Sequence, residues 1–104
     1  MFDDRLAEIY CGEFEGMVES AEMMESFWQA IQTGDRGTEQ FGAFIQRNCD
    51  LCDMIMQEYK GKTILIITHA ANTRIINYYF TGKSKQYDFT KRVVDEGGFI
   101  TLEN

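Results

Sequence analysis

The stretch that decides the fold is Thr63-Ile-Leu-Ile-Ile-Thr-His69-Ala-Ala-Asn72-Thr-Arg74-Ile-Ile-Asn-Tyr-Tyr-Phe-Thr-Gly82. Its first part, 64–67, is a continuous apolar run, which is typical of a strand that is covered on both faces. Its second part keeps apolar residues at helical spacing, with Asn72 as the expected N-cap and Gly82 as the expected C-cap. The stretch therefore predicts a strand that delivers His69, the only histidine of the chain, to the start of a helix.

This placement makes His69 a candidate for anion binding. Ligands of open α/β sheets bind beyond the carboxyl ends of the strands, and the free backbone N–H groups of a helix start attract anions. His69 therefore stands where a phosphate could be held. The alternative is a histidine whose ring is satisfied structurally at the end of a strand.

Composition limits the classes of partner. With 104 residues, 44% of them hydrophobic, the chain is one small domain or a piece of a larger one, with enough apolar residues for a core. Seventeen acidic and ten basic residues give a net charge of −7, which argues against nucleic acid and against an anionic membrane as partners. A phosphate site must accordingly rely on local donors.

The opening Met1-Phe-Asp-Asp has neither the basic nor the apolar region of a signal peptide, and no window is apolar enough to span a membrane. We therefore expect a cytoplasmic protein with reduced thiols.

Cys49-Asp-Leu-Cys52 has C-x-x-C spacing, and Cys11 with His69 could complete a set of four metal ligands. The pair falls inside a predicted helix, however, so we expect small buried hydrophobic residues, no metal and no cofactor.

The remaining elements follow from periodicity and glycines. Apolar residues at helical spacing predict a helix over 17–31, ended by Gly34, and a longer one from Thr38 as N-cap to Tyr59. Short strands are predicted near 6–10 and over 98–103. Two or three strands with three helices indicate an α/β fold, although the chain offers few neighbours for a central strand at 64–67.

Three segments in this order resemble the histidine phosphatase superfamily, the phosphoglycerate mutase-like proteins. They are Asp4-Arg5-Leu6-Ala7-Glu8 followed by Gly12-Glu-Phe-Glu-Gly16, Glu39 followed by Arg47, and Thr68-His69-Ala-Ala-Asn-Thr-Arg74. The resemblance covers nearly the whole chain. It implies a single partial domain over 1–104: a truncated three-layer α/β phosphoglycerate mutase-like domain with few strands and about three helices.

The resemblance also implies roles for individual residues. In that family two histidines and two arginines build a phosphate pocket, and the first histidine, in an Arg-His-Gly motif, is the nucleophile. Glu8 matches the general acid, and His69 matches the second histidine, which hydrogen-bonds the transferring phosphoryl group. Ala70 replaces the usual glycine but keeps its backbone N–H. The implied catalytic residues are thus His69 and Glu8, and the implied phosphate-binding residues are His69 and Ala70.

The Arg-His-Gly motif is absent from this sequence, so we expect a phosphomonoester-binding protein that is weak or inactive as an isolated chain. The alternatives are a non-catalytic remnant or interaction module, and one half of a two-chain phosphatase. Arg5 and Arg74 could supply some charge, although the position of Arg74 inside the helix favours a surface or structural ion pair. A phosphate ion or a phosphorylated small molecule is the expected ligand.

An uncovered strand edge also predicts a homo-oligomer. The simplest form is a dimer, in which the two copies could exchange elements.

Overall fold

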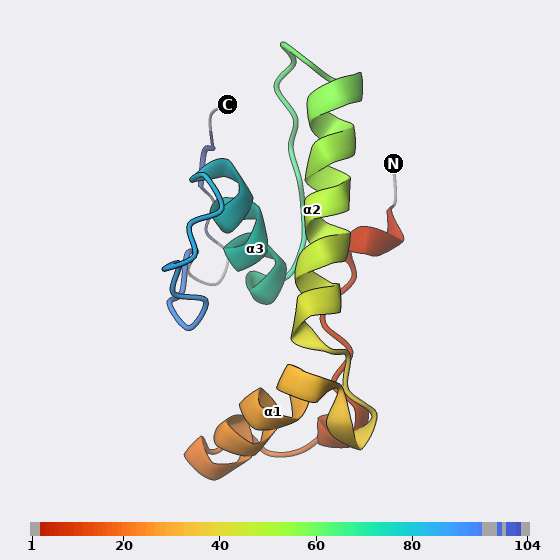
Figure 1. Cartoon of the computed structure of the whole chain (residues 1–104), viewed down its shortest axis with the longest axis vertical. Helices are drawn as coiled ribbons and strands as arrows, with labels where there is room; N and C mark the ends of the chain where they lie inside the picture. Colours follow the sequence, from red (N-terminus) through yellow and green to blue (C-terminus); the bar gives the residue numbers. More distant parts are fainter. Residues whose placement is uncertain (1–2, 95–97, 99, 103–104) are drawn as a thin grey trace. The chain divides into compact units, whose positions relative to one another are not determined.

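The structure is a computed structural model that describes residues 3–94, 98 and 100–102 (Figure 1). Its α-helices are α1 (Ala21–Thr33), α2 (Phe41–Glu58) and α3 (Ala70–Phe80). Three 3-10 turns accompany them, at η1 (Asp4–Leu6), η2 (Gly12–Phe14) and η3 (Asp35–Gly37).

The chain divides into two compact units. The first unit joins Met1–Glu8 to Arg47–Asn104, and the second unit is Ile9–Gln46. Helix α2 begins in the second unit and continues through the first. The prediction of a single domain over 1–104 stays a prediction.

The α/β prediction is wrong, because the regular structure of the described residues is helical and contains no strand. A strand exists only where its backbone is paired with another strand. Residues 63–67 are extended, but none of them makes a backbone–backbone hydrogen bond within the described part of the chain. The prediction of a buried strand at 64–67 is therefore wrong, because the segment has no strand partner among the described residues and the side chains of Leu65 and Ile67 are 82% and 83% exposed.

The other two predicted strands are also corrected. Residues 6–10 run from η1 into an irregular loop. In the C-terminal segment, residues 98 and 100–102 are not in a strand, and residues 99 and 103 of that prediction lie outside the described residues. A three-layer arrangement around a sheet is therefore not what these residues form.

Helix α1 starts later than its apolar pattern predicted. The side chain of Ser20 caps it by accepting a hydrogen bond from the Met23 N–H at 3.1 Å, and Gly34 ends it with a φ of 79°. The buried side is formed by Ala30 and Ile31, whereas the side chain of Trp28 is 40% exposed.

Helix α2 starts at Phe41 and not after Thr38. The Ala43 N–H donates to the side-chain oxygen of Gln40 at 2.8 Å, so Gln40 satisfies a donor of the first turn. The hydroxyl of Thr38 donates instead to the carbonyl of Asp35 at 2.7 Å and closes η3.

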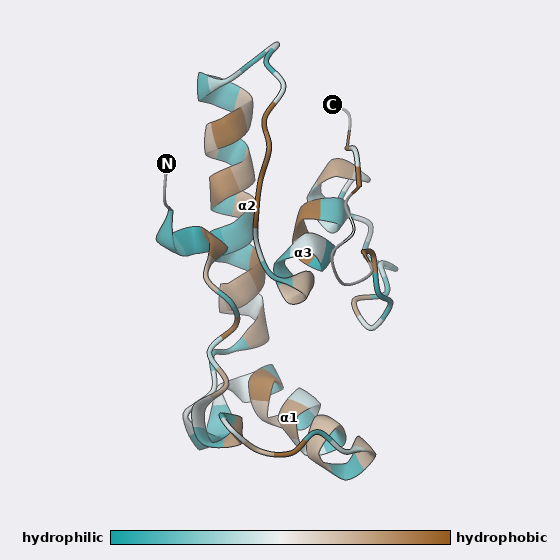
Figure 2. Cartoon of the chain, turned by 180° about the vertical axis from the view of Figure 1, so that it is seen from behind, coloured by the Kyte–Doolittle hydropathy of each residue, from teal (hydrophilic) through white to brown (hydrophobic). Residues whose placement is uncertain are grey.

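Side-chain hydrogen bonds join helices α2 and α3 in the first unit. The Asn72 amide donates to the Asn48 side-chain oxygen at 3.0 Å, and the Tyr79 hydroxyl donates to Asp53 at 2.6 Å. Between the two helices the chain returns beside α2 as the extended segment 63–68, whose apolar residues stand out along its length (Figures 1 and 2). This return brings His69 to the start of α3.

Among the described residues, no helix combines the length and the apolar character needed to cross a membrane.

Candidate functional site

His69 occupies the N-cap of α3. Its backbone is extended, with φ −95° and ψ 160°, and its side chain makes no capping hydrogen bond. The helix begins at Ala70, so the prediction of Asn72 as the N-cap is wrong. The first N–H groups of a helix have no hydrogen-bond partner inside the helix. In α3 the first of these groups belongs to Ala70, and both Ala70 and the preceding His69 are exposed. The start of α3 therefore offers backbone donors next to an imidazole.

Glu8 lies opposite the His69 ring. Its Oε2 atom is 3.8 Å from His69 Nδ1, and the two side chains are 61% and 54% exposed. This distance is within ion-pair range but longer than a hydrogen bond. The structure thus brings the two residues that were expected to be catalytic to the same place, with room for solvent or a ligand to reach both.

Backbone carbonyls, and not a strand ladder, hold the segment that carries Glu8. Arg47 of α2 donates to the carbonyls of Arg5 at 2.8 Å, Ala7 at 2.7 Å and Glu8 at 3.1 Å. The Thr68 hydroxyl donates to the carbonyl of Leu6 at 2.9 Å. Four successive carbonyls, of residues 5–8, therefore accept hydrogen bonds from side chains. This explains why the predicted strand near 6–10 is absent.

A buried pair of amides completes this arrangement. Asn72 of α3 is fully buried, and its side-chain amide donates both to the carbonyl of Ala7 and to Asn48 of α2, each at 3.0 Å. Asn48 is also fully buried. The two hydrogen bonds that the Asn72 amide nitrogen donates connect α2, α3 and the Glu8 segment, whereas Asn72 Oδ1 is buried and accepts no hydrogen bond within the described residues. We call Arg47, Asn48, Thr68 and Asn72 the carbonyl clamp.

The carbonyl clamp was not predicted from the sequence. Arg47 was noted only as part of the family resemblance, and Asn72 was assigned to capping. A signal existed for Asn48, because it falls four residues after Phe44 and four before Cys52 on the apolar stripe of α2. A polar residue at a core position usually has a specific partner.

The two candidate arginines are occupied by other contacts. Arg5 Nη2 lies 2.6 Å from Asp3, and hydrogen bonds from Arg5 lower the pKa of the Asp3 carboxyl to about 2. Arg74 donates to the backbone carbonyl of Phe89 at 3.0 Å, and no ion pair of Arg74 is found among the described residues, in contrast to the expectation. These contacts hold the guanidinium groups of Arg5 and Arg74 with protein partners, so they do not support a phosphate-binding role for either arginine.

Cys49 and Cys52 lie buried on α2. Burial raises the pKa of both thiols, that of Cys52 to about 12, so both behave as small apolar side chains at neutral pH. Within the described ranges, no cluster of three or more histidine, cysteine or acidic side chains is placed to hold a metal ion.

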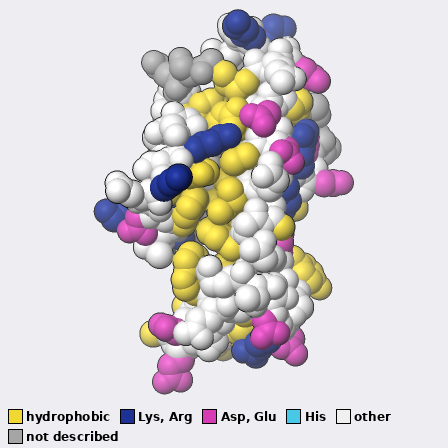
Figure 3. Space-filling view, viewed as in Figure 1, with side chains coloured by type: hydrophobic (Ala, Val, Ile, Leu, Met, Phe, Trp, Pro, Cys, Tyr) yellow, Lys and Arg dark blue, Asp and Glu magenta, His cyan; other side chains and the backbone are white. Residues whose placement is uncertain are grey.

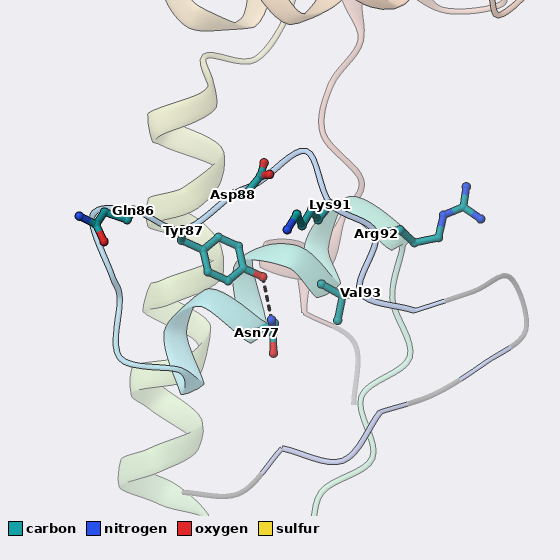
Figure 4. A pocket seen from close by; sticks show the side chains of 7 residues that line it. All are labelled: Asn77, Gln86, Tyr87, Asp88, Lys91, Arg92 and Val93. Carbon is teal, nitrogen blue, oxygen red and sulfur yellow. Dashed lines mark hydrogen bonds between the residues drawn. The ribbon is translucent and has the colours of Figure 1, made fainter.

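A cavity of about 490 Å³ lies away from this site (Figure 4). Its walls come from α3 and from the segment that follows, and the Asn77 amide donates to the Tyr87 hydroxyl at 2.8 Å across one side. Asp88 and Lys91 give it mixed charge, and neither His69 nor Glu8 lines it. The predicted phosphate position is thus an exposed helix start and not this pocket.

Comparison with known proteins adds one finding. The family model of the histidine phosphatase superfamily (branch 1) matches residues 1–103. No curated protein and no solved structure gives a significant match. The matched range includes the whole of the carbonyl clamp together with Glu8 and His69.

Proposed function

We propose, from the premise that the chain belongs to the histidine phosphatase superfamily, that it binds a phosphate group at the start of α3 without hydrolysing phosphomonoesters by itself. Membership makes phosphatase-like chemistry the relevant class. The ligand would be inorganic phosphate or the phosphate group of a small molecule.

One observation carries this proposal: the His69 ring and the Glu8 carboxyl group meet at 3.8 Å beside the exposed first turn of α3. A phosphate at this turn would accept hydrogen bonds from backbone N–H groups, beginning with that of Ala70, and from the His69 ring. Such donors stabilise the charge of a transferring phosphoryl group. By the family resemblance, Glu8 would be the group that gives a proton to the leaving oxygen if turnover occurred.

The lack of turnover follows from the same residues. Transfer through a phosphohistidine needs one group that attacks phosphorus and others that stabilise the charge. His69 is the single histidine of this sequence and cannot fill both positions at once. We therefore expect binding to survive in the isolated chain and hydrolysis to be weak or absent.

Phosphate binding is tested by removing one donor while keeping the helix. Ala70→Pro deletes the N–H at the first position of α3, where proline is well tolerated, and the extended backbone of His69 suits a residue that precedes proline. Ala70→Gly keeps the N–H and is the matched control. In titrations with inorganic phosphate followed by ¹H–¹⁵N NMR, we expect the wild type and the glycine variant to show saturable shifts around residues 69–72.

The proline variant should bind phosphate about tenfold more weakly, the loss of one hydrogen bond to a charged group. Equal affinities of the proline and glycine variants would contradict the proposed position. If phosphate produced no saturable shift in the wild type, the non-catalytic interaction module would be the better description.

Turnover is tested with an aryl phosphate, using the wild type beside His69→Ala and Glu8→Gln. We expect no rate above that of the His69→Ala protein. Hydrolysis that depends on both His69 and Glu8 would contradict the inactive part of the proposal and would identify a working phosphatase.

A further inference from the structure

The extended segment 63–67 leaves its backbone and one of its faces open. No backbone–backbone hydrogen bond involves these residues within the described part of the chain. Leu65 is 82% and Ile67 is 83% exposed, whereas the alternate residues Ile64 and Ile66 are more covered. Side chains two apart in an extended chain lie on the same face. Within the described residues, the segment therefore combines peptide groups that have no backbone partner with an apolar face.

Hydrophobic side chains also gather on the surface around this segment, in the upper part of the view in Figure 3. A row of unpaired N–H and C=O groups beside exposed apolar side chains is a template for another extended chain. The question is which chain fits.

We infer that the occupant is the same segment of a second copy, paired antiparallel about a two-fold axis at Ile66. In this register Leu65 of each copy lies opposite Ile67 of the other, so the two most exposed apolar side chains of the segment cover each other. An antiparallel pair of identical segments closes into a dimer, because each copy presents the same surface to its partner.

Charge supports this direction of pairing. Lys60 and Lys62 precede the segment, and Glu8 lies at its other end, beside His69. Antiparallel pairing brings the basic end of one copy to the acidic end of the other, whereas parallel pairing would place like charges together. The inference does not depend on the proposed phosphate chemistry.

The first test is the oligomeric state measured by sedimentation equilibrium, for the wild type, Ile67→Arg and Val18→Arg. Val18 is the matched control, because it is 89% exposed but lies in the second unit. We expect the wild type and Val18→Arg to form the same dimer, and Ile67→Arg to dimerise about tenfold more weakly or not at all. Helical circular dichroism verifies that each variant is folded.

A wild type that stays monomeric at all concentrations would overturn the inference, as would a dimer that Ile67→Arg leaves intact. Equal weakening by Val18→Arg would also contradict it, because the effect would then not belong to the segment.

The register is tested by disulfide formation in a Cys11→Ser background. Leu65→Cys and Ile67→Cys proteins are mixed, oxidised, digested and mapped by mass spectrometry. Opposite residues of an antiparallel pair lie close enough for a disulfide, so we expect the mixed product to dominate over either product of a single variant. A dominant product within one variant would contradict a two-fold axis at Ile66.

Discussion

At the scale of single residues, Arg47 determines how firmly Glu8 is held. It satisfies three carbonyls, of residues 5, 7 and 8, which are spread along an irregular segment. A guanidinium presents several donors in a fixed plane, whereas an ammonium is a point charge. The residue is therefore a positioning residue: it does not touch the proposed ligand but sets the place of Glu8.

We expect Arg47→Lys to lower the free energy of unfolding by about 1–3 kcal/mol, because at least one carbonyl loses its charged donor. Urea unfolding measures this change. The matched control is Arg36→Lys, since the Arg36–Glu13 ion pair is largely exposed and should change stability by less than about 1 kcal/mol. Equal effects of the two substitutions would show that the carbonyl clamp is unimportant for stability.

A second residue-scale prediction concerns Tyr79. Its hydroxyl donates to Asp53, and this hydrogen bond is the main cause that raises the pKa of the Tyr79 phenol to about 12. Because the folded pKa lies above the unfolded value, this contribution to stability is complete below about pH 10 and is lost as the pH rises through about 12.

Asp53→Asn should lower the pKa of Tyr79, because the charged acceptor is gone. Absorbance titration of the tyrosines at alkaline pH measures it, with Asp50→Asn on the same helix as the control. An unchanged last ionisation step in Asp53→Asn would show that the contact between α2 and α3 does not persist in solution.

At the scale of elements, local sequence signals and long-range pairing differ in how well they can be read. The helices were predicted because their periodicity, caps and glycines are local, and Gly34 does end α1 as expected. The starts of α2 and α3 were missed because Thr38 and Asn72 are better capping residues by composition than Gln40 and His69, which precede the helices in the structure. The start of α1 was missed because its apolar spacing extends before the cap at Ser20. The strand predictions were wrong because a strand forms only with a partner strand that is distant in the sequence, and no local pattern encodes that partner.

The candidate site shows the same division. His69 and Glu8 were identified, but Glu8 only through resemblance, since nothing local distinguishes it from the other acidic residues. The carbonyl clamp was missed because its acceptors are main-chain atoms, and these are identical at every position of a sequence.

The cap of α1 offers an element-scale prediction. Ser20→Ala removes the side-chain acceptor of the Met23 N–H and should cost about 1 kcal/mol of stability. Ser26→Ala, at an exposed position inside the same helix, is the control and should be neutral or slightly stabilising, because alanine favours helix. Thermal unfolding compares the two, and a larger loss from Ser26→Ala would contradict the assigned start of α1.

At the scale of the whole molecule, the net charge of −7 opposes the approach of any phosphate. The Debye length is about 30 Å at 0.01 M salt and about 10 Å at 0.1 M, so added salt screens this repulsion more than it screens short contacts at the site. The long-range field and the local donors should therefore respond differently to ionic strength.

We expect phosphate to bind about two- to threefold more tightly when NaCl is raised from about 0.01 to about 0.1 M at constant pH. Titration followed by NMR measures the dissociation constant at each salt concentration. A phosphate affinity that falls as salt rises would indicate that unrecognised positive charge dominates the site.

The way Glu8 is held has an evolutionary consequence. Every one of the twenty amino acids, proline included, carries a carbonyl, so changes of residue type at positions 5–8 leave the acceptors of the carbonyl clamp in place. The segment can consequently vary its side chains, and with them its chemistry, while the supporting residues Arg47, Thr68 and Asn72 cannot vary freely. In such an arrangement the side chain at position 8 is exchangeable, and the structural constraint rests on Arg47, Thr68 and Asn72.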